Sequence, residues 1–170
     1  MSRRRSETPA RISGSIVDHL RRHARERPEH IACRFLSDGE RELQTFDYAD
    51  LDRRARAMAA RILAEGGRGE RALLLLPPGP EYVLAFVGCL YAGAIPVPVY
   101  PPAWMRTTDR IDRICQNSGA RLVIADEQVR DHMLRMGEGP LTGLRWLLAS
   151  SIDLSAADDV TPHDPEPDDL

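Results

Sequence analysis

The sequence contains no lysine, because all 23 basic residues among its 170 are arginine. Such a chain has no lysine side chain for a Schiff base, for nucleophilic catalysis or for a phosphate loop that depends on lysine. It also has only three cysteines, too few for a disulfide scaffold. Cys33, Cys89 and Cys115 are widely spaced, without a CxxC pair or a nearby histidine partner. We therefore predict that they are reduced thiols in the core rather than ligands or nucleophiles.

Long apolar runs are also missing. The longest nearly apolar stretch, Tyr82 to Val99, is interrupted by prolines and glycines, whereas a membrane span needs roughly 20 apolar residues. The arginines at the start continue into polar sequence rather than into the apolar segment of a secretory signal. The hydrophobic content of 42% and the length fit one globular domain. We expect a soluble protein located in the cytoplasm.

Charge of either sign is unevenly spread along the chain, whose formal net charge is −3. Residues 1–71 carry 16 arginines and 12 acidic residues, and residues 151–170 carry seven acidic residues and no base. The arginines alternate with Glu and Asp, whereas a nucleic-acid surface calls for a basic stripe with interleaved aromatics. Solvated helix faces are thus favoured over a phosphate-binding patch, and no nucleic-acid partner is expected.

The first 70 residues predict a helix, a hairpin and a second helix. Residues 1–14 are polar and arginine-rich and are predicted to be flexible. Apolar residues at helical spacing follow Ser15 up to Pro28, and two short strands at 31–36 and 42–46 flank a turn at 37–40. Asp47 is a candidate N-cap for an amphipathic helix that Gly66 and Gly67 close.

From residue 72 onward, short apolar strands alternate with helices. The expected strands are 72–76, 95–100, 121–125 and 145–149, and the expected helices are 80–92, 107–117 and 127–136. This order predicts right-handed βαβ units and an α/β fold with a mostly parallel sheet and flanking helices. Pro96 and Pro98 place the second strand at an edge or make it irregular. The helix at 80–92 is apolar nearly all round and is expected inside the protein. Residues 151–170 are acidic and Pro-rich and are predicted to form an exposed linker.

Three glycine- or proline-rich segments are candidates for ligand loops. The Ser13–Ser15 segment is too short for a phosphate loop and no strand precedes it. The glycines at 66–69 precede a strand instead of following one, so a helix C-cap is favoured. The turn at 77–80 does lie between a strand and a helix, where α/β proteins bind ligands. Three of its four residues are prolines without an N–H, and Glu81 would repel an anion, so a rigid turn is favoured.

Polar candidates for metal or acid–base chemistry are also weak. Asp18, His19 and His23 could place two imidazoles one helical turn apart, but no third ligand is evident and neighbouring arginines disfavour a cation. The pairs Asp158-Asp159 and Asp168-Asp169 lie in the acidic tail and read as solvated acids. The motifs in the sequence thus predict no catalytic residue, no cofactor-binding residue and no metal ligand.

One long pattern is more informative than any single motif. FDYADLDRRARAMAARILAEG at 46–66, followed by ERALLLLPPGPEYVLAFVGCLYAGAIPVPVYPP at 70–102, resembles the N-terminal portion of adenylate-forming ligases. Within that superfamily AFVGCLYAG and PVPVYPP look most like the fatty acyl-AMP ligases, whereas acyl-CoA ligases and peptide-synthetase adenylation domains usually continue differently. SIVDHLRRHARERPEHIACRFL at 15–36 and RLVIAD at 121–126 also fit.

The resemblance implies an enzyme that uses ATP and Mg²⁺ to convert a fatty acid into an acyl-adenylate and pyrophosphate. The acyl group would then pass to the thiol of an acyl carrier protein in lipid, polyketide or lipopeptide biosynthesis. Residues 15–150 would be part of the AMP-binding domain of such an enzyme. The family's Ser/Thr/Gly-rich phosphate loop with its lysine, its metal-binding acid and its C-terminal catalytic lysine have no counterpart in the 170 residues, so no functional residue is carried over.

Two hypotheses of different classes follow. In the first, the chain is the N-terminal segment of a fatty acyl-AMP ligase (a truncated enzyme, part of a split gene or a relic) that supplies framework and binds neither ATP nor Mg²⁺ alone. In the second, it is a non-catalytic interaction module whose exposed edge and apolar surface dock the complementary segment of a split ligase. Neither hypothesis includes a membrane span.

Overall fold

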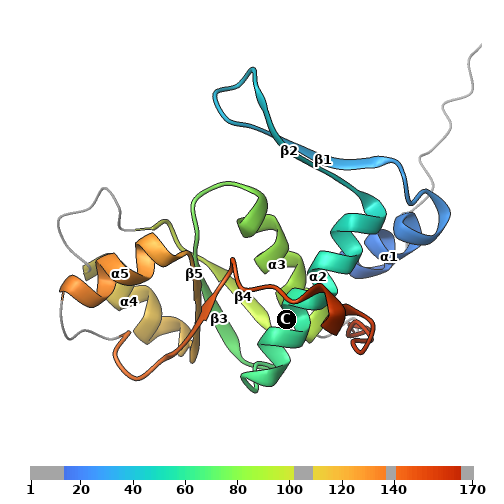
Figure 1. The fold of residues 1–170 in the computed structure, drawn as a ribbon. Coiled ribbons are helices and arrows are strands. Elements are labelled where there is room, and N and C mark those ends of the chain that lie inside the picture. Colours follow the sequence, from blue (N-terminus) through green and yellow to red (C-terminus); the bar gives the residue numbers. More distant parts are fainter. Residues whose placement is uncertain (1–13, 102–108, 137–140, 166–170) are drawn as a thin grey trace, which may run out of the picture.

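A helix and a β-hairpin open the fold, as expected. The computed structural model describes residues 14–101, 109–136 and 141–165 (Figure 1). Helix α1 (Ile16–Glu26) begins at Ser15, whose Oγ accepts from Asp18 N at 3.1 Å while Asp18 accepts from Ser15 N at 2.8 Å. This reciprocal capping box satisfies two of the free N–H groups at the helix start. Strands β1 (Ile31–Leu36) and β2 (Glu42–Asp47) pair antiparallel and project away from the body of the molecule.

Helix α2 (Tyr48–Ala64) starts and stops where the sequence predicts. Asp50 N donates to Asp47 Oδ1 at 2.7 Å, which confirms Asp47 as the N-cap. At the other end Gly66 adopts φ +66°, a left-handed conformation that glycine tolerates best. Gly67 N donates to Ile62 O at 2.9 Å, closing the last turn. The expectation that the glycines at 66–69 form a helix C-cap is therefore confirmed.

Four parallel strands form the main sheet, in the order β4-β3-β5-β6. The strands are β3 (Arg71–Leu75), β4 (Ile95–Pro98), β5 (Leu122–Ala125) and β6 (Arg145–Leu148), and the helices between them are α3 (Pro80–Ala92), α4 (Asp109–Ser118) and α5 (Glu127–Met136). The predicted fold class is confirmed, and β4 is an edge strand as its prolines indicate. Residues 107 and 108 of the expected fourth helix lie outside the described residues.

Each face of the sheet has its own apolar core. Helices α2 and α3 cover one face, where their side chains pack with Leu74, Ile124 and Leu147. Helices α4 and α5 cover the other, where they pack with Leu73 and Val123. Adjacent residues of a strand point to opposite faces, so strands without polar residues are typical of a sheet covered on both sides.

Helix α3 packs closely on α2 but is not enclosed on every side. A Cβ atom added to Gly88 would lie 2.4 Å from Met58 Cγ and 2.7 Å from Met58 Cβ, so only glycine fits this contact. Cys89 and Ala92 are fully buried, whereas Tyr82, Phe86 and Leu90 are only half-buried. The expectation of an entirely internal helix is thus met on one side of α3 and not on the other.

Residues 151–165 lie against α2 and α3 through a few buried residues, with exposed residues between them. A short 3₁₀ turn, η2 (Leu154–Ala157), packs on α2 with Ala157 fully buried. Arg56 Nη1 donates to Val160 O at 3.0 Å, and His163 N donates to Tyr91 O at 2.7 Å. The segment is therefore docked rather than loose, because Ala157 and Val160 complete the apolar cover of α2 and hydrogen bonds tie the segment down, while its acidic side chains Asp158 and Asp159 are exposed as expected.

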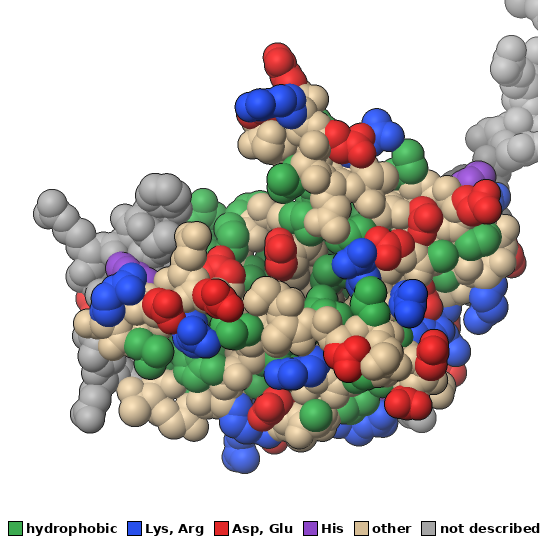
Figure 2. All heavy atoms as spheres, viewed as in Figure 1, with side chains coloured by type: hydrophobic (Ala, Val, Ile, Leu, Met, Phe, Trp, Pro, Cys, Tyr) green, Lys and Arg blue, Asp and Glu red, His purple; other side chains and the backbone are tan. Residues whose placement is uncertain are grey.

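Charged side chains of both signs are interspersed on the face shown in Figure 2. On α2, Arg54 pairs with Asp50 at 2.8 Å and Arg56 pairs with Asp52 at 2.7 Å, both at i,i+4 spacing. These pairs agree with solvated, internally neutralised helix faces. Among the described residues, none of the helices has the length and apolarity needed to cross a membrane.

Replacing Gly88 by alanine should destabilise the protein by about 1–3 kcal/mol, because the added methyl group overlaps Met58. Urea unfolding followed by circular dichroism measures the loss. In a Met58→Ala background the same Gly88→Ala change should cost less, since the obstructing side chain is gone. Equal costs of Gly88→Ala in both backgrounds would show that the two helices do not touch as described.

Candidate functional site

The topology of the sheet nominates one edge as a ligand-binding site. After β3 the chain goes through α3 to β4 on one side, and it then crosses to β5 on the other side of β3. In open α/β sheets ligands bind outside the carboxyl ends of the strands where the connections diverge in this way. The segments that meet there are residues 76–79 after β3, residues 99–101 after β4 and Asp126 after β5. We call this region the carboxyl-edge site.

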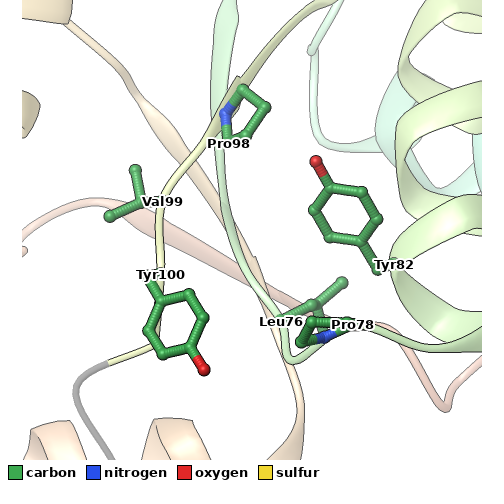
Figure 3. Close-up of a pocket in the computed structure, with 6 residues that line it drawn as sticks. All are labelled: Leu76, Pro78, Tyr82, Pro98, Val99 and Tyr100. Atoms are coloured by element: carbon green, nitrogen blue, oxygen red, sulfur yellow. The ribbon is translucent and has the colours of Figure 1, made fainter.

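One half of the carboxyl-edge site is an apolar cavity of about 230 Å³. Figure 3 shows Tyr82 on α3 and Tyr100 after β4 on opposite sides of the opening, with Leu76 and Pro78 between them. Pro98 and Val99 complete the lining. The Tyr82 ring stacks on Phe86 with centroids 6.4 Å apart, which holds it at the rim. The lining is suited to contact with an apolar group and offers no charged side chain.

The other half, a cavity of about 310 Å³, shares Tyr100 and is more polar. It is lined on one side by Asp126, His132 and Arg135 from the start and body of α5. Asp126 Oδ1 accepts from Val129 N at 2.6 Å, so this carboxylate caps α5 rather than facing an open site. His132 Nε2 is buried and has no hydrogen-bond partner within the described residues.

Neither cavity assembles a catalytic constellation from the described residues. In these parts of the chain no group of three or more His, Cys, Asp or Glu side chains is close enough to hold a metal ion. No hydroxyl or thiol of the two linings is hydrogen-bonded to a histidine or carboxylate there, as an activated nucleophile would be. The geometry of the described residues therefore supports binding of an apolar group next to polar side chains.

The proline turn is the sequence candidate that lies at this edge. Gly79 is the residue before α3, no side chain caps the helix there, and Pro80 takes the first helical position, where its missing N–H costs nothing. Pro78 lines the apolar cavity, and Pro77 lines the more polar one. The segment is thus a turn that shapes a cavity wall. Of the Ser13–Ser15 segment, Ser15 is the N-cap of α1 and Ser13 lies outside the described residues.

The remaining polar candidates lie elsewhere and do not come together. Asp18 serves in the capping box of α1, and this hydrogen bonding lowers the pKa of its carboxyl group. Arg22 Nη2 lies 2.8 Å from His19 Nδ1, and the His23 ring lies 4.8 Å from that of Tyr48. Asp158 and Asp159 are both exposed. The second acidic pair, Asp168-Asp169, is outside the described residues.

The three cysteines are thiols outside disulfide bonds, and none of them lines either cavity of the carboxyl-edge site. Cys89 and Cys115 are buried, in the two different cores, and Cys33 is half-buried on β1. Burial raises the pKa of the Cys89 thiol to about 12, and it also raises the pKa of Cys33 and of Cys115. A thiol with a raised pKa is a poor nucleophile at neutral pH.

The sequence did not indicate that Tyr82, Tyr100 and His132 would line the site. Tyr82 looks like one more apolar position of α3, and His132 is a lone histidine on a short helix. Tyr100 follows two prolines at the end of an edge strand, and an aromatic at the carboxyl end of a strand is the one pattern that could have indicated it. The cavity depends on the strand order, which the sequence does not state.

Comparison with known proteins assigns the class. The architecture matches the fatty acid AMP ligase from Legionella pneumophila with a TM-score of 0.80 and 36% identity, covering 92% of this chain and 27% of that one. The medium-chain fatty acid–[acyl-carrier-protein] ligase JamA of Moorena producens is 30% identical over 145 residues, which are 81% of this chain and 24% of JamA. The long-chain fatty acid–AMP ligase FadD32 of Mycolicibacterium smegmatis is 37% identical over 106 residues.

The fold is that of the large N-terminal domain of adenylate-forming enzymes. The model of the AMP-binding enzyme family matches residues 20–170, and the chain belongs to this family. The relatives named above are fatty acyl ligases, which confirms the resemblance seen in the sequence. The chain spans about a quarter of the length of JamA and of the Legionella ligase.

The buried thiol of Cys89 should make the stability fall as the pH rises above 9. The unfolded chain releases this proton near the ordinary value of 9.0, whereas the folded protein holds it until about 12. Between these values the unfolded state gains stability, by up to about 1.4 kcal/mol per pH unit. Urea unfolding at pH 8, 9 and 10 measures the slope.

Cys89→Ala should flatten this slope, and Cys33→Ser should change it less because Cys33 is only half-buried. A parent protein whose free energy of unfolding is constant from pH 8 to 10 would contradict the burial of Cys89.

Proposed function

We propose that the chain is the N-terminal portion of a fatty acyl-AMP ligase and forms the framework on which the remaining portion completes the active site. The observation that carries this proposal is the match to the Legionella ligase, at 36% identity over 92% of this chain but only 27% of that one. In the reaction of the complete enzyme, a fatty acid carboxylate attacks the α-phosphate of ATP. Acyl-adenylate forms, pyrophosphate leaves, and a carrier-protein thiol then displaces AMP.

The described residues do not fit ATP and Mg²⁺ by themselves. The chain has no lysine to bind phosphate groups, and its described part has no cluster of oxygen ligands for a divalent cation. The first cavity of the carboxyl-edge site is apolar and offers no charged side chain to a phosphate, and in the second the Asp126 carboxylate is engaged as the cap of α5. ATP and Mg²⁺ would accordingly bind to residues outside this chain.

The partners follow from the same assignment. The name of JamA describes a ligase that joins a fatty acid to an acyl carrier protein. We propose that a carrier protein also accepts the acyl group from the complete form of this enzyme. The second proposed partner is the complementary ligase segment. Residues 15–150 would be the portion of the AMP-binding domain present here, with 151–165 as the strap that closes over α2.

A second candidate function, a non-catalytic interaction module, is favoured by the surface of α3. Tyr82, Phe86 and Leu90 recur at i,i+4 spacing on its half-buried side, next to the exposed Ile16 of α1. A contiguous apolar stripe that is only partly covered by the core is the kind of surface on which a partner can dock. The two candidates differ in whether the assembled partner gains ligase activity.

The 170-residue chain alone should not catalyse ATP–pyrophosphate exchange with medium- or long-chain fatty acids. Radiolabelled pyrophosphate incorporation into ATP measures this, with the intact Legionella ligase as the positive control. Adding the complementary portion of a ligase should produce exchange above the background of that portion alone. Turnover by the chain alone would overturn the proposed role as framework, and binding of the partner without exchange would favour the interaction module.

A further inference from the structure

Helix α1 carries a cluster of three arginines that no acidic side chain of the described residues neutralises. Arg25 follows Arg21 by four positions and Arg22 by three, a spacing that brings side chains to the same side of a helix. None of the three forms an ion pair within the described part of the chain. On α2, by contrast, Arg54 and Arg56 are each paired with an aspartate of their own helix. The positive charge of α1 therefore remains available to a partner.

The arginine cluster borders a hollow of about 270 Å³. Its lining consists of the three arginines, His19 and two carboxylates, Asp18 and Asp164. Asp18 is already engaged, because its Oδ2 accepts from Ser15 N at 2.8 Å and from Ser15 Oγ at 2.9 Å. Asp164, which belongs to the strap, is exposed. Three guanidinium groups and two carboxylates leave an excess of positive charge in the hollow.

Two buried donors beside the hollow have no acceptor. Arg22 Nη2 donates to His19 Nδ1 at 2.8 Å, so a neutral His19 ring carries its proton on Nε2. His19 Nε2 and Arg21 Nε are both buried, and neither has a hydrogen-bond partner among the described residues. Buried donors are paired in most native proteins. The group that is missing from the hollow is thus an acceptor, and a carboxylate, which accepts only, has the required chemistry.

The strap brings an acidic sequence to this hollow. His163 N donates to Tyr91 O at 2.7 Å, which fixes the chain immediately before Asp164. The next acidic residues in the sequence are Glu166, Asp168 and Asp169. An extended chain spans at most about 3.6 Å per residue, so the last of these carboxylates lies within about 18 Å of Asp164. The arginine cluster itself covers only about 6 Å along the helix axis. All three carboxylates can therefore reach it.

We propose that the acidic segment 164–169 docks on the arginine cluster of α1 and closes the strap as a clasp. Its four carboxylates would face three guanidinium groups and supply acceptors for the two unpartnered donors. One exposed ion pair contributes little to stability, whereas a network of several charges contributes more. The hydrogen bond of His163 keeps the segment beside the cluster, which raises its effective concentration. This interaction does not depend on the proposed ligase function.

Other anionic occupants fit the arginine cluster less well. A nucleic acid would find no aromatic side chain in the lining on which a base could stack. A free phosphate ion would have to enter a hollow that Asp164 already lines. The acidic segment of a second copy of the chain would bind without a tether and would compete poorly with the segment that is attached next to the cluster.

Neutralising the segment tests the proposal, with an equal change elsewhere in the acidic stretch as the matched control. The test variant combines Asp168→Asn with Asp169→Asn, and the control combines Asp158→Asn with Asp159→Asn. Both variants remove two negative charges and preserve side-chain size. Asp158 and Asp159 are exposed and do not line the hollow, so only the test variant should weaken the clasp.

A nitroxide label next to the segment reports its position. The label is attached to Leu170→Cys of the 170-residue chain in a Cys33→Ser background, since Cys89 and Cys115 are buried. In the parent and in the control variant, the label should broaden the amide signals of Arg22 and Arg25 in the nuclear magnetic resonance spectrum. The test variant should lose this broadening by at least threefold. The dispersion of the remaining signals establishes that each variant is folded.

Charge reversal tests the same contact from the side of α1. Arg22→Glu combined with Arg25→Glu should abolish the broadening of the amides at both positions, and adding Asp168→Arg and Asp169→Arg to this variant should restore it. Arg53→Glu, at an exposed position of α2, should leave it unchanged. Raising the sodium chloride concentration from 0.1 to 1 M should reduce the broadening in the parent, because the screening length falls from about 10 to about 3 Å.

Four results would overturn the proposal. They are absence of broadening on α1 in the parent, an equal loss in the two asparagine variants, failure of the charge reversal to restore the contact, and broadening that passes from a labelled chain to a second, unlabelled one. Phosphate that displaces the segment more strongly than sodium chloride at the same ionic strength would also contradict it, because the hollow would then be a phosphate site.

Discussion

The close contact between α2 and α3 is the constraint on which the rest of the structure depends. Because Gly88 has no side chain, Met58 can lie directly on the α3 backbone, and Ala55 and Ala59 bring the helices together along the same stripe. That approach sets the thickness of the layer over the sheet. It also fixes the position of α3, whose first turn holds Tyr82 at the rim of the apolar cavity.

Polar contacts at the margin of this interface extend it to the end of the described chain. Tyr91 donates its hydroxyl proton to Asp52 at 2.8 Å, and Asp52 also pairs with Arg56. Arg56 in turn holds Val160 O, so the strap over α2 depends on the same helix pair. Burial, together with the Asp52 charge, raises the pKa of Tyr91, so this hydroxyl remains a donor well above neutral pH.

Local structure was largely predictable because the determinants lie within a few residues of each other. The Asp47 cap, the left-handed Gly66 and the apolar strand at β3 each follow from short-range rules, and the prolines of β4 indicate an edge. The strap at 151–165 was not predictable, because its hydrogen bonds to α2 and α3 join residues more than 70 positions apart and its composition is that of a solvated tail. Composition reports average polarity, whereas docking depends on the two buried residues Ala157 and Val160 and on these hydrogen bonds.

In the candidate site, too, the local structure was predictable from the sequence and the long-range arrangement was not. A turn between strand and helix at residues 77–80 is visible in the sequence, but the cavity beside it requires the order β4-β3-β5-β6, which places Tyr100 and Asp126 next to that turn. The family assignment came from a long pattern of residues rather than from a catalytic motif. It accordingly supports the proposed role as a framework and identifies no residue of the chain with a step of the reaction.

Equilibrium binding of Mg²⁺–ATP to the 170-residue chain tests the central claim most directly. Without lysine and without a cation-binding cluster in its described part, the chain should give no saturable heat of binding in calorimetry at millimolar nucleotide. Stoichiometric binding in the micromolar range would contradict the account, because it would place a complete nucleotide site within a chain assigned here as framework.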